Sequence, residues 1–230
     1  MIIALNNKSN LNKYEFNSYQ EQLNKIETNN QIIVCPTFLN INLYNSKFDL
    51  GSQNVSKNTK GAYTGEISAE DLKESNVKYC IIGHSERREY QKESLEDINE
   101  KIKRLEENNI IPILCVGETK EERDNNQVKD IIRKELESAI EGINNVDNII
   151  IAYEPIWSIG TGIIPTNEEI VEVFDFIKTI LPNNKILYGG SANDENIDTL
   201  KQIKQIDGYL LGGLSLKPDK LQVFINKIEN

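Results

Sequence analysis

The stretch Ile149-Ile-Ile-Ala-Tyr153, followed at once by Glu154-Pro155, shows the pattern that decides the fold of this 230-residue chain. Five apolar residues in a row are typical of a strand buried on both faces of a parallel sheet, because such a strand has no solvent-facing side to alternate with. A carboxylate and a proline then end the run. The same arrangement recurs along the chain, with each apolar run bounded by Gly, Pro or Asn and followed by a polar amphipathic stretch.

The same pattern of short apolar runs predicts eight strands, at Ile2–Leu5, Ile32–Cys35, Phe48–Gly51, Tyr79–Ile82, Ile110–Cys115, Ile149–Tyr153, Ile186–Tyr188 and Tyr209–Leu211. Helical patterns lie between them, at Ser18–Glu27, Ala69–Ser75, Ser94–Asn108, Val128–Ile143, Asn167–Leu181, Glu195–Ile203 and Pro218–Ile228. Ser94 and Thr166 each precede acidic residues in a first helical turn and have the features of N-caps. The crossover at residues 40–47 is short and poorly patterned.

Strand–helix alternation repeated eight times, with no linker or low-complexity break, predicts an α/β fold: one (β/α)8 TIM-barrel domain over residues 1–230. The length fits one such domain, although barrels of this type typically have roughly 250 residues. A doubly wound open sheet is the structural alternative that the pattern leaves open.

The composition excludes several classes of function. A formal net charge of −10 disfavours nucleic acid and anionic membrane surfaces as partners. No apolar run approaches the length of a membrane span, and Met1–Leu5 is too short and uncharged for a signal peptide. Cys35, Cys80 and Cys115 lack CxxC spacing and lie in or beside apolar runs, which favours reduced core thiols. Because the chain has one histidine, we do not expect a zinc site of the usual His/Cys type. The reduced thiols and the lack of a membrane or signal segment lead us to expect a cytoplasmic protein.

Polar side chains follow three of the predicted strands at the point where each strand ends. Asn6 and Lys8 follow the first, His84 and Glu86 the fourth, and Glu154 the sixth. Taken singly, Lys8 fits a solvated loop and His84 a structural role, whereas a carboxylate at the end of so apolar a strand is costly to bury without a partner or a task. Because the carboxyl ends of barrel strands share one face, we expect these groups to converge there.

Glycine-rich turns follow the last three strands: Ser158-Ile-Gly-Thr-Gly162, Gly189-Gly-Ser191 and Gly212-Gly213. Each alone fits a tight turn, but together they offer closely approachable backbone N–H groups, which bind phosphate without needing net positive charge. A base, a carbonyl polariser, a lysine and phosphate-binding turns suit proton abstraction next to a carbonyl in a small phosphorylated substrate. This chemistry requires neither a metal nor an organic cofactor.

At these residues the chain closely resembles the triosephosphate isomerase family from end to end. The resemblance is carried by Asn6-Asn7-Lys8; Gln53-Asn54 with Gly61-Ala-Tyr-Thr-Gly-Glu-Ile-Ser68; Ile82-Gly-His-Ser-Glu-Arg-Arg88; Ala152-Tyr-Glu-Pro-Ile-Trp-Ser-Ile-Gly-Thr-Gly162; Tyr188-Gly-Gly-Ser191; and Gly212-Gly213. It implies interconversion of dihydroxyacetone phosphate and D-glyceraldehyde 3-phosphate through an enediolate, a reaction of glycolysis and gluconeogenesis.

The resemblance also implies a role for each matching residue. Glu154 would shuttle the proton, and His84 would polarise the carbonyl as a neutral imidazole, for which this family is the standard example. Lys8 and Asn6 would stabilise the enediolate and contact the substrate, and Glu86 would support this network. Phosphate would be held by Gly160, Ser191, Gly212 and Gly213.

Two further features follow from the resemblance. Residues 155–165 would form a lid that excludes water, a behaviour for which this family is again the example; its residues include Pro155, Trp157, Ile159, Gly162 and Pro165. The chain would form a homodimer in which Thr64, in the third loop, braces the partner's catalytic network.

The chain is shorter than the family pattern before Gln53 and between the lid and Tyr188, where we expect trimmed outer helices, and it departs from that pattern in two further places. Asn7 replaces a tryptophan; as a neighbour that points away from the site, it should alter packing only. Ile163-Ile164-Pro165 replaces Lys-Thr-Ala at the trailing hinge of the lid, and proline has no N–H to donate to Tyr188. We therefore expect closure to rest on Ser191 with Gly162, and Tyr188→Phe to have a small effect.

Two other functions remain open at this point. Other phosphate-binding barrels, such as sugar-phosphate epimerases or indole-glycerol-phosphate synthases, share glycine turns after strands seven and eight. They lack the pairing of His84-Ser-Glu86 with Glu154-Pro-Ile-Trp157. A non-catalytic scaffold that inherited the barrel would be favoured by loss of Lys8, His84 or Glu154, and all three residues are present.

Overall fold

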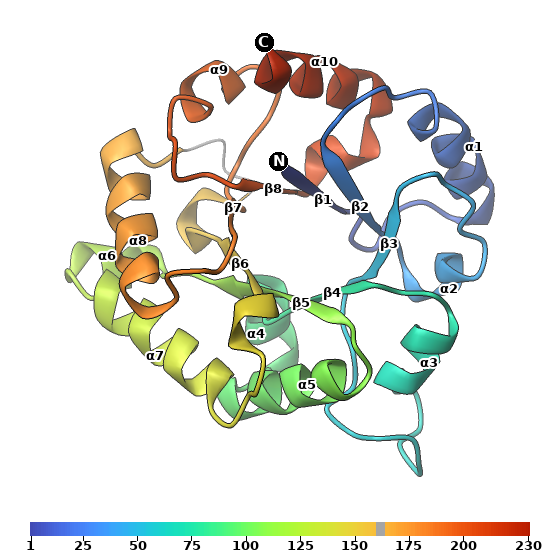
Figure 1. Ribbon diagram of the computed structural model, residues 1–230, viewed down its shortest axis with the longest axis horizontal. Helices are drawn as coiled ribbons and strands as arrows, with labels where there is room; N and C mark the ends of the chain where they lie inside the picture. The colour runs from blue at the N-terminus through green and yellow to red at the C-terminus, as the bar shows by residue number, and fades with distance from the viewer. Residues whose placement is uncertain (160–163) are drawn as a thin grey trace.

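The strands close into a parallel barrel in which each strand pairs with the next and β8 pairs with β1 (Figure 1). The computed structural model describes residues 1–159 and 164–230. The strands are β1 Ile2–Asn6, β2 Gln31–Cys35, β3 Asp49–Ser52, β4 Tyr79–Ile82, β5 Ile111–Val116, β6 Ile150–Tyr153, β7 Ile186–Tyr188 and β8 Gly208–Leu211. The (β/α)8 prediction is confirmed, and the open-sheet alternative is wrong because β8 and β1 are paired.

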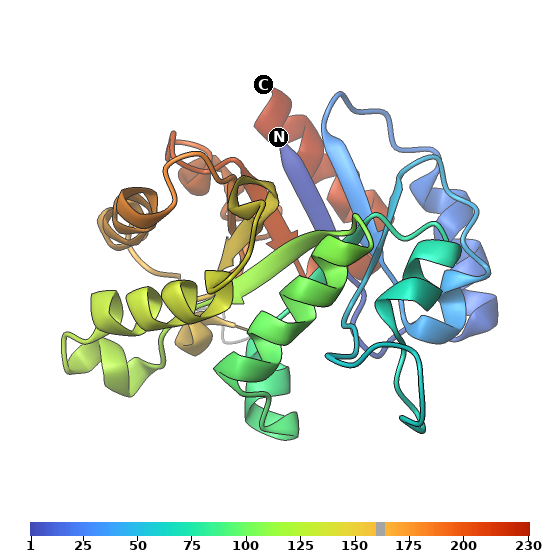
Figure 2. The ribbon, with the colours of Figure 1, turned by 60° about the horizontal axis from the view of Figure 1, so that its bottom comes forward.

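Helices surround the barrel (Figures 1 and 2). They are α1 Lys13–Leu23, α2 Phe38–Ile41, α3 Ala69–Glu74, α4 Ser85–Gln91, α5 Leu95–Glu107, α6 Lys120–Asp124, α7 Val128–Ile140, α8 Asn167–Ile180, α9 Ile197–Leu200 and α10 Pro218–Glu229, with 3-10 turns η1 Val146–Asn148, η2 Ile156–Ser158 and η3 Gly213–Leu216. No helix in the described ranges is both long and apolar enough to cross a bilayer.

The helix predictions differ from the structure mainly at short elements. Helix α1 begins at Lys13, before the expected start, because Asn12 forms a capping box with Glu15. Helices α2, α4 and α6 were not predicted, since each has seven residues or fewer and shows little apolar periodicity. Ser94 and Thr166 do cap α5 and α8, each within a capping box.

Alternation along the strands places the candidate residues. On β6, Ile150 and Ala152 face the barrel interior, whereas Ile151 and Tyr153 pack against the helices. Both faces are therefore buried, which explains the continuous apolar run. The next residue on the interior side is Glu154, at the mouth of the barrel, where it is buried.

Strand β1 follows the same rule, with Ala4 inside the barrel and Leu5 outside it. Asn6 and Lys8 accordingly line the hollow at the barrel mouth. Asn7 turns away from that hollow, as predicted, and its buried amide donates to the Tyr19 hydroxyl (3.4 Å) and to Ser215 Oγ (3.3 Å).

Candidate active site

A pocket of about 330 Å³ opens at the carboxyl ends of β1, β4, β6, β7 and β8. Eight of the residues predicted from the sequence line it: Asn6, Lys8, His84, Glu154, Ile159, Ser191, Gly212 and Gly213. The structure thus brings together the groups that follow strands far apart in the sequence. Gly160 and Gly162, expected to bind phosphate and to belong to the lid, lie outside the described residues.

His84 caps the N-terminus of α4 with its side chain. Its Nδ1 accepts a hydrogen bond from the backbone N–H of Glu86 at 3.2 Å. A nitrogen that accepts carries no proton, so the proton of the neutral imidazole is on Nε2. Nε2 lies 3.2 Å from Oε1 of Glu154, at the pocket wall. The ring therefore presents a donor to the pocket.

Glu154 is held by α4 and fitted between two glycines. Its Oε2 accepts from the backbone N–H of Ser85 at 3.4 Å. A Cβ at Gly117 would come within 1.7 Å of the Glu154 carbonyl oxygen, and one at Gly189 within 2.8 Å of Glu154 Cγ. Both positions therefore require glycine for the carboxylate to reach its place.

Lys8 reaches the pocket from a strained backbone. Its φ of 49° is in the left-handed region, which costs a non-glycine residue about 1–3 kcal/mol. Two side chains stabilise this turn: Asn6 Oδ1 accepts from Lys8 N (3.0 Å), and Gln53 Nε2 donates to the Lys8 carbonyl (2.8 Å). The Lys8 ammonium forms an ion pair with Glu86 Oε1 at 2.5 Å, so Glu86, which we expected to support this network, contacts Lys8 directly.

The turns after β7 and β8 also line the pocket. Gly189–Asn193 and Gly212–Leu214 line the pocket, and η3 begins there with Gly213. Ser191 Oγ donates to the Ser158 carbonyl at 2.6 Å, which joins the β7 turn to the turn after β6. Lys8 lies against Gly212, whose added Cβ would meet Lys8 Cε at 3.3 Å. Among the described lining residues Lys8 is the one cation, so an anion would lie between it and backbone N–H groups.

The remaining predicted residues lie outside this lining. Pro155 is buried beside Glu154, Trp157 lies in η2, and Pro165 lines a separate hollow against α9. Thr64 is exposed in the loop between β3 and α3.

Sequence reasoning missed a buried polar cluster next to the site. Glu118, fully buried, accepts from Trp157 Nε1 (2.9 Å) and Arg123 Nε (2.8 Å) and lies 3.2 Å from the Tyr153 hydroxyl. The signal was present: Glu118 comes two residues after the apolar run of β5, much as Glu154 comes directly after that of β6.

Comparison with known proteins supplies the family. The family model described as triosephosphate isomerase matches residues 1–228. The chain belongs to the triosephosphate isomerase family. Among the triosephosphate isomerases that it resembles, that of Mycoplasmopsis pulmonis is 41% identical over 210 residues (88% of this chain, 84% of the relative). That of Mesomycoplasma hyorhinis is 45% identical over 205 residues (87% and 84%), and that of Alkaliphilus oremlandii 39% over 226 residues (91% and 90%).

The family assignment agrees with the barrel and with the position of the pocket at its carboxyl-terminal face. The known reaction of triosephosphate isomerases belongs to glycolysis, and it acts on a triose phosphate. A pocket of this size with one cation and two glycine turns suits such a substrate.

Proposed function

We propose that this chain interconverts dihydroxyacetone phosphate and D-glyceraldehyde 3-phosphate, with Glu154 as the base and His84 as the electrophile. The observation that carries the assignment is the 3.2 Å contact between His84 Nε2 and Glu154 Oε1 on the pocket wall, beside Lys8. A proton donor for a carbonyl and a proton acceptor for the adjacent carbon are thereby placed within one substrate's reach.

The reaction follows from these positions. Glu154 removes a proton from the carbon next to the carbonyl, while His84 Nε2–H donates to the carbonyl oxygen. The Lys8 ammonium and the Asn6 amide stabilise the charge of the enediolate. His84 gives its Nε2 proton to the carbonyl oxygen and takes up the proton of the hydroxyl group on the carbon that Glu154 deprotonated, so that the second oxygen becomes the new carbonyl oxygen. Glu154 then returns its proton to the former carbonyl carbon, which completes the isomerisation without a metal or organic cofactor.

The phosphate group would bind at the turns after β7 and β8. We assign it to the backbone N–H groups of Ser191, Gly212 and Gly213, with Gly160 as a further donor by family resemblance. The position of Lys8 against Gly212 supports this assignment, because the ammonium is then close to both the phosphate and the reacting carbons. Glu86 orients Lys8 through their ion pair.

The test measures isomerisation of D-glyceraldehyde 3-phosphate with a coupled dehydrogenase, in the native chain and in Glu154→Gln. We expect turnover in the native chain and a fall of about 10²–10⁴-fold in the variant. Glu137→Gln, an exposed carboxylate of α7, is the matched control and should retain native turnover. Activity that survives Glu154→Gln would overturn the assigned base, and a folded but inactive native chain would favour the scaffold.

We also propose a homodimer. Residues 59–66 are exposed throughout, and the β3–α3 loop that contains them extends away from the barrel (Figure 2). Thr64 lies within this stretch, next to Tyr63, which is 48% exposed; Leu39 of α2 is 90% exposed. A partner subunit that covered Tyr63 and Leu39 would remove their apolar surface from water. Analytical ultracentrifugation should give a dimer, with Leu39→Asp shifting it to monomer; a native monomer at micromolar concentration would contradict the proposal.

The remaining assignments concern the chain as a whole. We propose that residues 1–230 act as one barrel domain that works in the cytoplasm. Support for this location comes from Cys35, Cys80 and Cys115, which are unpaired and buried.

A further inference from the structure

Arg123 of α6 contacts four separate segments around the polar cluster beside the active site. Its Nε donates to Glu118 (2.8 Å), Nη2 to the Tyr153 hydroxyl (3.0 Å) and Nη1 to Glu169 of α8 (3.0 Å). Its guanidinium carbon lies 5.3 Å from the centre of the Trp157 ring. The side chain is only 13% exposed. A planar, forked cation is the one side chain that can make these contacts at once.

Two of these contacts hold the chain that carries Glu154. Tyr153 ends β6 and immediately precedes Glu154, and its hydroxyl lies between Arg123 and Glu118. Trp157 lies in η2, three residues after Glu154, where its Nε1 donates to Glu118 and its ring lies against Arg123. Tyr153 and Trp157, on either side of the proposed base, are therefore both held by the buried ion pair between Arg123 and Glu118.

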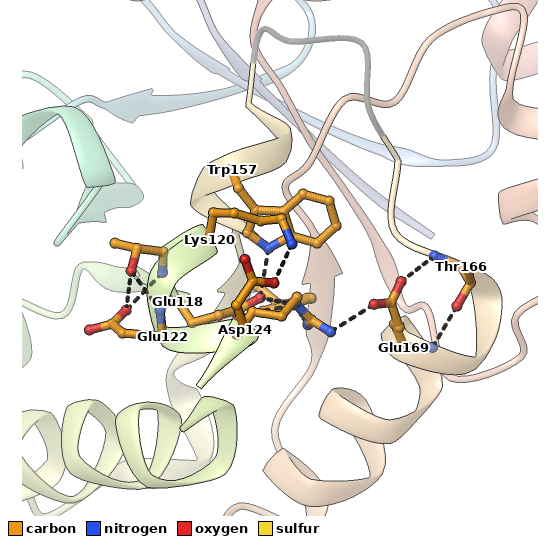
Figure 3. Close-up of polar contacts among 10 residues, drawn as sticks. Glu118, Lys120, Glu122, Asp124, Trp157, Thr166 and Glu169 are labelled. Carbon is orange, nitrogen blue, oxygen red and sulfur yellow. Dashed lines mark hydrogen bonds and ion pairs between the residues drawn. The ribbon is translucent and has the colours of Figure 1, made fainter. Parts of the chain in front are cut away.

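A third contact joins this cluster to the start of α8. Glu169 Oε2 accepts from the backbone N–H of Thr166 (2.7 Å), which completes the N-terminal capping box, while Oε1 pairs with Arg123. Figure 3 shows the arrangement, with Trp157 and Glu118 on one side and Glu169 with Thr166 on the other. One carboxylate thus ties the first turn of α8 to the same arginine that holds Tyr153 and Trp157.

We propose that Arg123 is a positioning residue for the isomerisation: it fixes residues 153–159, which carry Glu154 and Ile159 into the pocket, against residues 164–169 at the start of α8. This inference rests on the function proposed above. Among the residues that the structure describes, the partners of Arg123 are not part of the pocket lining, so Arg123 acts through the placement of Glu154. Three of the four proposed phosphate donors, Ser191, Gly212 and Gly213, lie on the turns after β7 and β8, and none of the four contacts of Arg123 lies on those turns.

The experiment compares Arg123→Gln with Arg133→Gln, a matched arginine of α7 that pairs with Glu137 and lies over Phe176, remote from the pocket. A misplacement of about 1 Å at a reacting group costs on the order of 10²-fold in rate. We therefore expect kcat of Arg123→Gln to fall about 10- to 100-fold. KM and the inhibition constant of inorganic phosphate should change less than about threefold, because three of the four proposed phosphate donors, Ser191, Gly212 and Gly213, follow β7 and β8. Arg133→Gln should leave all three constants unchanged.

A milder pair of variants keeps the proposal testable if Arg123→Gln folds poorly. Glu169→Gln removes only the ion pair between Arg123 and α8. Glu172→Gln removes a different ion pair of α8, the one with Lys129 of α7 (2.7 Å). We expect kcat to fall about two- to fivefold in Glu169→Gln and not in Glu172→Gln, as for loss of one partly exposed ion pair. The sole tryptophan gives a second readout, since acrylamide should quench Trp157 more strongly in Arg123→Gln than in the native chain.

Three outcomes would overturn the proposal. Native kcat in folded Arg123→Gln or Glu169→Gln, with only a lower melting temperature, would make Arg123 a purely structural residue. A parallel rise in KM and in the phosphate inhibition constant would mean that the whole pocket had collapsed. Equal acrylamide quenching of native and Arg123→Gln proteins would show that Arg123 does not hold Trp157, and this measurement does not depend on activity. An inactive native chain would instead overturn the proposed function on which this proposal rests.

Discussion

Gly189→Ala gives a sharp test of how Glu154 is placed, because it adds one methyl group beside the proposed base. The new Cβ would lie 2.8 Å from Glu154 Cγ and 3.2 Å from the Tyr153 carbonyl oxygen. Carbon atoms in ordinary contact are about 3.5–4.0 Å apart, so Glu154 Cγ must retreat by roughly 1 Å. Its carboxylate would then lose its contacts with His84 and with Ser85 N.

The expected magnitude follows from this displacement. A shift of about 1 Å at a catalytic group costs on the order of 10²-fold, so kcat should fall about 30- to 100-fold while KM stays within about threefold. Overpacking a buried site also costs about 1–3 kcal/mol of unfolding free energy. For a chain of this size each kcal/mol lowers Tm by about 2–4 °C. The variant should therefore remain folded at 25 °C.

The assay is the coupled dehydrogenase reaction at 25 °C, with circular dichroism as the check on folding. A double-mutant cycle in unfolding free energy with Glu154→Ala isolates the contact, since alanine lacks the Cγ that the new methyl would strike. Gly189→Ala should cost less unfolding free energy in the Glu154→Ala background than in the native one. A kcat within twofold of native, or equal costs in both backgrounds, would refute the reasoning that Gly189 is needed to make room for Glu154.

The remaining predictions use other groups. Tyr188→Phe should lower kcat less than about tenfold, the worth of one neutral hydrogen bond, because the buried hydroxyl's neighbour is Ser158; a hundredfold loss would contradict the expected lid hinge. A saturating transition-state analogue should change the emission of Trp157, and an unchanged spectrum would count against movement of that turn. Burial alone would raise the pKa of the Glu93 carboxyl, but hydrogen bonds from Lys101 and Arg87 (2.6 Å each) hold that pKa below its usual value. Its contribution to unfolding free energy is therefore present above the unfolded pKa of about 4.3 and is lost as pH falls through the lower folded pKa. Glu93→Gln should cost about 3–5 kcal/mol at pH 7, measured by urea unfolding, because it leaves Lys101 buried without its counter-charge; a pH profile as steep as native below pH 5 would exclude Glu93 as the source. Iodoacetamide at pH 8 should label none of the three cysteines in the folded chain, because burial raises the pKa of Cys80 to about 12 and those of Cys35 and Cys115 likewise upward; rapid labelling would show that the core opens.

The barrel and most of the pocket lining could be predicted from one sequence because both follow from local pattern. Residues such as Ile149–Tyr153 are apolar on both faces, and only a parallel sheet covered by helices buries both. Repeated eight times, this pattern leaves few folds to choose among. Once the strands are placed, period-2 alternation carries Asn6, Lys8 and Glu154 to the interior side at the carboxyl end.

Short elements were predicted less well. Helices α4 and α6 have seven and five residues, too few for an apolar period to appear. Their stability comes instead from side chains at their ends and from tertiary contacts. Arg123, near the end of α6, has partners on four other segments, and no spacing within α6 indicates them.

The local pattern is therefore enough to predict an α/β fold of eight strand–helix units, the side on which its polar strand ends meet, and the residue types available there, whereas closure of the barrel is shown by the pairing of β8 with β1. The tertiary structure alone decided which groups touch: the acceptor role of His84 Nδ1, the pairing of Lys8 with Glu86, and the need for glycine at 117 and 189. The physical reason is that burial and backbone preference act on neighbouring residues, so they leave a periodic signal in the sequence. A hydrogen bond or a steric limit between segments depends on a distance of a few ångströms, and that distance exists only after the whole barrel has closed.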